Sequence, residues 1–159
     1  MQPQLIHSKE RRLIGKRTRM SFNDNRTLDL WRSFMPKRKE IINKLNENFY
    51  SIEIYDSSFF KSFNPEADFE KWAAIEVGDF VEVPKELETI TIPEGLYAVF
   101  IHKGPASEGY KTFKFIFENW LPASGYEVDH RPHFGIMGEK YKQDDPDSEE
   151  ELWIPIVVK

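Results

Sequence analysis

The stretch that decides the fold is GLYAVFIHKGP, residues 95–105. Its β-branched and aromatic side chains predict a strand over 96–102, and the dipeptide Gly104-Pro105 ends that strand. Apolar side chains then recur at helical spacing and predict a helix that stops before Gly125. The members of this apolar stripe are Tyr110, Phe113, Phe117, Trp120 and Leu121.

The segment that follows this helix predicts two strands, over 132–137 and 152–158. The acidic run 144–151 lies between them and predicts a solvated turn around Pro146. An EF-hand calcium loop is excluded there, because the run offers no glycine at its sixth position. The second half of the chain therefore has the order strand, helix, strand, strand.

The first half predicts the same order of elements. We expect a strand over 11–22, a helix after the turn at 23–25, and strands over 51–55 and 71–77. The first helix carries Leu28, Trp31, Phe34 and Met35, and a second helical piece beyond Pro36 carries Ile41, Ile42, Leu45 and Phe49. A loop is expected at 63–68, and a short strand at 90–92 opens the second half.

Local echoes support a duplication, since Glu70-Lys71-Trp72 and Glu151-Leu152-Trp153 fall at the same place in each half. Matches this short also arise by chance. The predicted fold class is α+β, with a duplicated strand–helix–strand–strand module in a single domain over 1–159 and pseudo-repeats at about 1–79 and 86–159. We expect antiparallel sheets paired about a pseudo-two-fold axis, with the helices on one face and a ligand cleft on the other.

Composition excludes several classes of protein. The chain of 159 residues has no cysteine, so disulfides, thiolate catalysis and cysteine-based metal sites are excluded. Its net charge of −5 disfavours nucleic-acid binding, and the basic run 9–19 predicts a strand with a solvated basic face. We see neither a secretory signal nor an apolar run that could cross a membrane, and we expect a cytoplasmic protein without cofactors.

Strand alternation indicates which carboxylates share a surface with aromatic side chains. Along 152–158 the apolar residues Leu152, Ile154 and Ile156 occupy one face, so Glu151 and Trp153 share the other. Extending the alternation to the other strands predicts a ligand-binding face made of Glu53, Tyr55, Trp72, Glu76, Met137, Glu151 and Trp153. The alternative is a solvated sheet face with scattered aromatics. His130 and His133 flank Pro132, which disfavours a shared metal, so no metal site is predicted.

Several motifs, in this order and spacing, resemble the GyrI-like small-molecule-binding family, which is related to the effector-binding domains of AraC- and MerR-type transcription regulators. The matching segments are 72–77, 95–105, 120–126, 131–134 and 150–156. The resemblance covers nearly the whole chain and implies the duplicated fold described above. It also implies a cleft in which a buried glutamate and aromatic side chains bind bulky, aromatic or cationic compounds.

The resemblance identifies Glu151 as the matching glutamate, with Trp153 beside it. Some relatives are similar to hydrolases that open the cyclopropane of DNA-alkylating compounds; for that chemistry Glu151 would be the general base, with Trp153 and Tyr55 stacking on the substrate. One departure is Gly135, because the family often has glutamate at this place. Glu53, in the first half, could compensate for the missing carboxylate.

Three functions remain open at this point. The first is binding of an amphipathic, aromatic or cationic small molecule by a stand-alone module, for sensing or sequestering a drug or toxin. The second is hydrolysis of a strained, electrophilic toxin at Glu151. The third is a protein-interaction module that modulates topoisomerase.

Overall fold

The computed structural model describes residues 1–62 and 64–159, and the described residues form one antiparallel sheet of nine strands. The strands are β1 (Gln4–Ser8), β2 (Arg11–Met20), β3 (Phe49–Ile54), β4 (Phe69–Val77), β5 (Glu88–Ile92), β6 (Gly95–Lys103), β7 (Tyr126–Val128), β8 (His133–Met137) and β9 (Glu149–Val158). The helical segments are α1 (Thr27–Phe34), η1 (Lys37–Glu40), η2 (Ala106–Glu108), α2 (Gly109–Phe115), the π-helical η3 (Ile116–Trp120) and α3 (Leu121–Ala123). The α+β class and antiparallel sheet predicted from the sequence are confirmed.

The strand order is β1-β6-β9-β8-β3-β4-β2-β5, with β7 paired to β9 at the side. The two halves of the chain meet at the β3–β8 pair. Read outward from this pair, the first half has the order β3-β4-β2 and the second half has the order β8-β9-β6. This arrangement has the order that the duplication predicts. The pseudo-two-fold axis itself stays a prediction.

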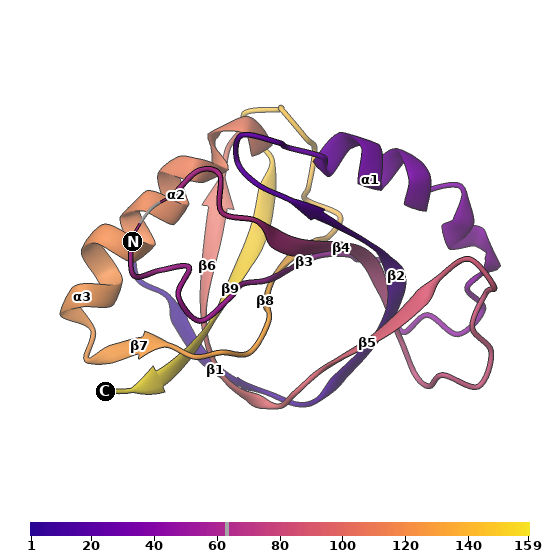
Figure 1. Cartoon of the computed structure of the whole chain (residues 1–159), viewed down its shortest axis with the longest axis horizontal. Coiled ribbons are helices and arrows are strands. Elements are labelled where there is room, and N and C mark those ends of the chain that lie inside the picture. Colours follow the sequence, from indigo (N-terminus) through magenta and orange to yellow (C-terminus); the bar gives the residue numbers. More distant parts are fainter. Residues whose placement is uncertain (63) are drawn as a thin grey trace.

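Two long, bent segments, β1–β2 and β5–β6, curl the sheet on itself (Figure 1). The segment β1–β2 runs antiparallel to β5–β6 in one continuous register, from Gln4 opposite Val99 to Gly15 opposite Glu88. As a result β1 of the first half pairs with β6 of the second half, and β5 pairs with β2. The opening strand of each half thus hydrogen-bonds to the other half.

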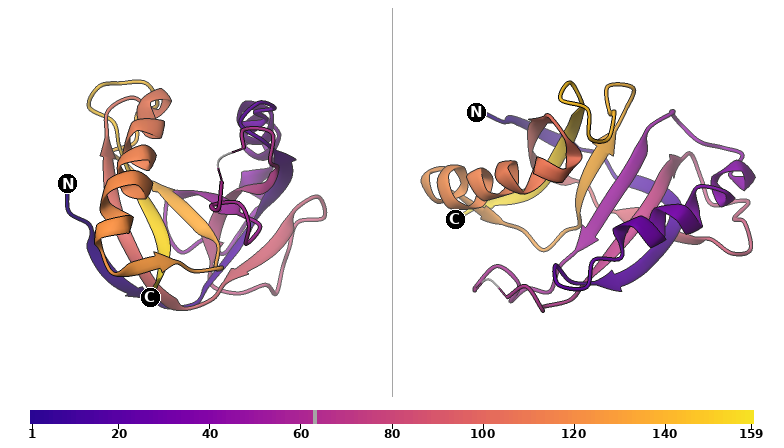
Figure 2. Two further views of the ribbon diagram at one scale, coloured as in Figure 1. Left: turned by 60° about the vertical axis from the view of Figure 1, so that its left-hand side comes forward. Right: turned by 90° about the horizontal axis from the view of Figure 1, so that it is seen from above.

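Helices α1 and α2 lie on the outer face of this curled sheet, as Figure 2 shows. The side chains of cross-strand partners point to the same side of a sheet. One row of such partners runs across both halves: Leu152, Gly135, Ser51 and Ala73. Ala73 belongs to the apolar cluster under α1, and Leu152 to the cluster under α2. The prediction of helices on one face is confirmed.

The inner face is filled for most of its extent by a third apolar cluster. Its members are Leu13, Tyr50, Ile52, Trp72, Ala74, Ile92, Tyr97, Val99, Phe134, Ile136 and Trp153, all buried. They come from seven strands, because the curled sheet surrounds them. The free concave surface expected from the sequence is therefore reduced to a pocket at one edge, described below.

The helical piece predicted beyond Pro36 is wrong over residues 41–49. Beyond Pro36 the chain makes only the short η1, Ile41 is extended, and Lys44 bridges to Val77 of β4. Asparagines explain the difference, because their amide groups compete with helical hydrogen bonds. Asn46 accepts a bond from the backbone N–H of Asn48, and Asn43 donates to the Asp79 carbonyl.

Strands β1 and β7 were not predicted, since each is short and lies at the border of the sheet. The expected loop 63–68 begins at Phe63, which lies outside the described residues. In the described part of the chain no helix combines the length and the apolar character that crossing a bilayer requires.

Candidate functional site

Two pockets border the sheet in the described part of the chain. The edge pocket, of about 680 Å³, is lined by Met1, Gln2, Gln4, Ile6, Val99, Ile101, Lys103, Thr112, Glu151 and Trp153. The cleft pocket, of about 240 Å³, is lined by Tyr55, Asp56, Ser57, Phe60, Lys61, Leu121, Val128, Asp129, His130, Arg131 and His133. The two pockets share no residue. Of the predicted site residues, Glu151 and Trp153 line the edge pocket and Tyr55 lines the cleft pocket. The other four line neither pocket: Glu53, Trp72, Glu76 and Met137.

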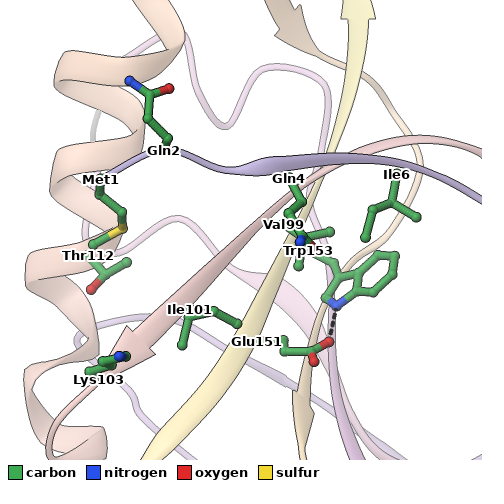
Figure 3. Close-up of a pocket in the computed structure, with 10 residues that line it drawn as sticks. All are labelled: Met1, Gln2, Gln4, Ile6, Val99, Ile101, Lys103, Thr112, Glu151 and Trp153. Carbon is green, nitrogen blue, oxygen red and sulfur yellow. Dashed lines mark hydrogen bonds between the residues drawn. The ribbon is translucent and has the colours of Figure 1, made fainter.

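The edge pocket contains the glutamate and tryptophan that the family resemblance singles out. The Trp153 indole N–H donates a hydrogen bond of 2.9 Å to Glu151 Oε1, so the carboxylate is held against the ring edge. Figure 3 shows these joined side chains on one side of the pocket, facing Met1, Thr112 and Lys103 on the other. Alternation within β9 predicted correctly that Glu151 and Trp153 lie on one face.

Glu76 and Trp72 lie in the inner apolar cluster. Arg11 pairs with Glu76 at 3.0 Å, and the Tyr50 hydroxyl donates to the same carboxylate at 2.6 Å. The Arg11 guanidinium stacks on Trp153, 5.0 Å from the ring centroid, and on Phe134, at 5.2 Å. The side chain of Arg11 thus already occupies the aromatic, acidic environment beside Glu76 that was expected to receive a ligand.

Glu53 lies on the outer face, between the two helix-covered clusters. Its side chain is 13% exposed, and its nearest cation is Lys71 Nζ, at 4.0 Å from Oε1. Oε2 is buried and lacks a hydrogen-bond partner among the described residues. Burial raises the pKa of Glu53 to about 7, although the positive charge of Lys71 opposes the shift.

Glu150 and His133 adjoin Glu53. Burial raises the pKa of Glu150, and its Oε2 lies 3.6 Å from the point where a side chain on Gly135 would begin. A carboxylate from β9 thus reaches the place left empty by Gly135 on β8. His133 is the cross-strand partner of Glu53; burial, then the charge of Arg131, lower its pKa to about 3, so the imidazole is neutral.

Aromatic rings surround this group of polar side chains. Tyr55 packs edge-on against His133, with centroids 4.9 Å apart, and burial raises its pKa well above the usual value. Phe60 packs against two of these rings: its ring is nearly parallel to that of Phe117, with centroids 4.9 Å apart, and to that of His133, at 5.4 Å. The Phe117 and His133 centroids are 6.5 Å apart, so the three rings form a triangle. Phe117 belongs to the π-helical turn η3, and such turns are frequent at functional sites.

The predicted binding face is wrong in one respect. Trp72, Glu76, Glu151 and Trp153 point to the inner side, whereas Glu53, Tyr55 and Met137 point to the helix-covered side. The register decides this, because Ile52 rather than Glu53 is the partner of Trp72, and Phe134 rather than Gly135 is the partner of Trp153. Alternation relates residues within a strand and carries no information on the phase between strands.

Sequence reasoning did not select Phe60, Lys71, Phe117, His133 or Glu150 for the site. The density of aromatics in the segment Tyr55–Phe60 was an available signal for part of this group. In the described part of the chain, no three His, Asp or Glu side chains lie close enough together to hold a metal ion.

Comparison with known proteins decides the family. A model of the GyrI-like small molecule binding domain matches residues 1–157. The chain belongs to this family. The GyrI-like chain is 32% identical over 133 residues to the transcriptional regulator BrlR of Pseudomonas aeruginosa. The aligned stretch covers 80% of this chain and 45% of the regulator. It therefore spans less than half the length of that relative.

Solved structures share the GyrI-like fold. The C-terminal domain of EcmrR superposes with a TM-score of 0.75 at 18% identity, covering 99% of this chain and 98% of the other. The structure of SAV2435 bound to tetraphenylphosphonium gives a TM-score of 0.74 at 12% identity, covering 99% and 94%. The family predicted from the sequence motifs is confirmed, and the chain is a small-molecule-binding domain of that family.

Proposed function

We propose that this GyrI-like domain binds an aromatic or amphipathic cation at the cleft pocket, with Glu53 as the counter-charge, and so senses or sequesters a drug or toxin. The observation that carries the proposal is the buried Glu53 carboxyl, one oxygen of which has no partner among the described residues. Burying such a group costs folding free energy unless something compensates it. A bound cation would both ionise this carboxyl and pair with it.

Phe60 indicates where the aromatic part of the ligand would lie. Its ring packs against both Phe117 and His133, although 40% of the residue is exposed to solvent. One of these two neighbours, His133, is the cross-strand partner of Glu53. A ligand ring that replaced Phe60 would therefore bring an attached cation close to the carboxyl. Displacement of Phe60 would also enlarge the cleft pocket, which at 240 Å³ is small for a drug-sized ligand.

The roles of the seven predicted residues follow from this arrangement. We assign the ionic contact to Glu53 and an aromatic wall to Tyr55, with Met137 on the same side of the sheet. Trp72 and Glu76 support the site from the inner cluster, while Glu151 and Trp153 serve the edge pocket. The tetraphenylphosphonium in SAV2435 is an aromatic cation of the kind proposed, and BrlR is a regulator, a context in which such binding would serve sensing.

Tetraphenylphosphonium is the probe for this proposal. Isothermal titration calorimetry at pH 8 should detect binding to the wild type, and Glu53→Gln should weaken it by about tenfold or more, because the ionic contact is lost. The matched control is Glu127→Gln, which neutralises an exposed carboxylate on β7 and should leave the affinity unchanged. Equal affinity of the Glu53→Gln variant and the wild type would refute the assignment of the site.

The same carboxyl favours hydrolysis as a second candidate function. A pKa of about 7 suits a general base near neutral pH. In a conjugated cyclopropane substrate, Glu53 would take a proton from water as the water oxygen bonds to a ring carbon. The ring C–C bond would break, and its electrons would pass to the conjugated acceptor.

Product analysis separates the binder from the hydrolase, and Glu53 from the Glu151 base expected from the family resemblance. Ring-opened product that is lost in Glu53→Gln and kept in Glu151→Gln would establish hydrolysis at Glu53. The opposite pattern would place the general base at Glu151. Unchanged substrate with the wild type, together with measurable binding of tetraphenylphosphonium, would leave the binding function alone.

A further inference from the structure

The Glu-x-Trp motif builds the same hydrogen bond in both halves of the molecule. In β4 the Trp72 indole N–H donates to Glu70 Oε2 at 2.9 Å, and in β9 the Trp153 indole N–H donates to Glu151 Oε1 at 2.9 Å. In each case the indole orients one carboxylate oxygen. The second oxygen remains free for another partner.

The first half provides that partner from its own chain. Arg17 Nη1 donates to Glu70 Oε1 at 2.8 Å, while its Nε lies 2.9 Å from Glu88 Oε2 on β5. The arrangement is a carboxylate held by an indole and paired with a guanidinium. It shows what this motif can bind.

Strand register identifies the equivalent positions in the second half. Arg17 lies opposite Trp72, and Arg19 lies opposite Glu70. On β6 the corresponding partners are Val99, opposite Trp153, and Ile101, opposite Glu151. Two cationic positions of the first half are therefore aliphatic in the second half.

The edge pocket lies where these cations are missing. Val99 and Ile101 line it together with Glu151, which forms no ion pair in the described part of the chain. Its volume of about 680 Å³ is suited to a small molecule. Ile6 adds apolar surface on the neighbouring strand β1, so the walls suit an aliphatic stem and one wall carries a carboxylate.

We propose that the edge pocket is a second binding site, which takes an alkylguanidinium ligand. The guanidinium would occupy, beside Glu151, the place that Arg17 occupies beside Glu70, and the alkyl stem would lie on Val99 and Ile101. A guanidinium presents several N–H donors, so one of them can bond the Glu151 oxygen that the indole does not hold, as Arg17 Nη1 bonds Glu70 Oε1. Lys103 is an exposed cation at the rim and weakens binding by repulsion. This site is independent of the cleft function proposed above.

The test uses n-butylguanidinium as the probe and the neutral n-butylurea as its control. The four tryptophans give four indole N–H signals in a ¹H–¹⁵N spectrum, which Trp→Phe variants assign. Butylguanidinium should shift the Trp153 signal and leave the Trp72 signal unchanged, whereas butylurea should shift neither. A short blocked peptide with one arginine tests the same chemistry on a polypeptide; equal binding of the peptide would indicate an exposed arginine as the ligand source.

Variants of the two halves complete the test. Glu151→Gln should weaken binding by about tenfold or more, while Glu70→Gln, the equivalent change in the first half, should not weaken it. Lys103→Ala should strengthen binding. Val99→Arg should abolish binding, because it restores the pair present in the first half, and its melting temperature reports whether it folds. Absence of a Trp153 shift in the folded wild type, or a shift that persists in Glu151→Gln, would overturn the proposal.

Discussion

Glu53→Gln should make the protein more stable at alkaline pH. Folding moves the pKa of this carboxyl from its ordinary value of 4.5 to about 7. Between these two values the folded state keeps a proton that the unfolded chain has released, so stability falls as the pH rises through this window. Above pH 7 the whole penalty is present, and it amounts to about 3 kcal/mol. Glutamine is neutral at every pH and escapes this penalty.

Urea unfolding of the wild type and the variant at pH 5 and pH 8 measures the effect. The variant should gain about 2 kcal/mol relative to the wild type between the two pH values, because at pH 5 most of the penalty is absent. His133, whose folded pKa is about 3, also makes stability depend on pH, but it is present in both proteins and cancels in the difference. Glu127→Gln, on the surface, should show no such gain. The same stability difference at both pH values would refute the argument that Glu53 is buried without compensation.

Three other changes test the packing described above. Phe60→Ala should bind tetraphenylphosphonium on the order of tenfold more tightly, because the contacts of Phe60 with two rings no longer have to be broken. Calorimetry measures this affinity, and weaker binding would make Phe60 part of the site. Arg11→Met should cost about 3 to 5 kcal/mol in urea unfolding, since Glu76 is left buried and unpaired, and the double change with Glu76→Gln should recover part of this loss. Gly15→Ala should lower the free energy of unfolding by about 1 to 3 kcal/mol. The new methyl group would collide with the Ala73 carbonyl and lie 2.8 Å from the Ala74 Cα. Thermal unfolding measures this loss, and an unchanged melting temperature would contradict the close approach of β2 and β4.

The main elements of the fold could be predicted because each carries its own periodicity. Alternation in β9 is a local pattern, and the structure bears it out. The apolar stripe of the second helix is local too: Phe113, Phe117, Trp120 and Leu121 pack against the sheet from α2, η3 and α3, whereas Tyr110 is exposed. Residues 41–49 show apolar spacing typical of a helix, but asparagine side chains bond to nearby backbone there and the helix does not form. Strand β1 is stable only through its partner β6, which lies about ninety residues further along the chain.

The chemistry of the site was predicted only in part. The sequence alone determined that Glu151 and Trp153 share a face, since alternation within one strand is set by backbone geometry. It also determined the family, through motifs that follow one another in order. Only the tertiary structure decided that Glu53 lies on the opposite side of the sheet from Trp72, that Arg11 already neutralises Glu76, and that Phe60 packs against His133. These facts depend on register between strands and on contacts between distant segments, and the free energies that select them come from burial and pairing that no local pattern encodes.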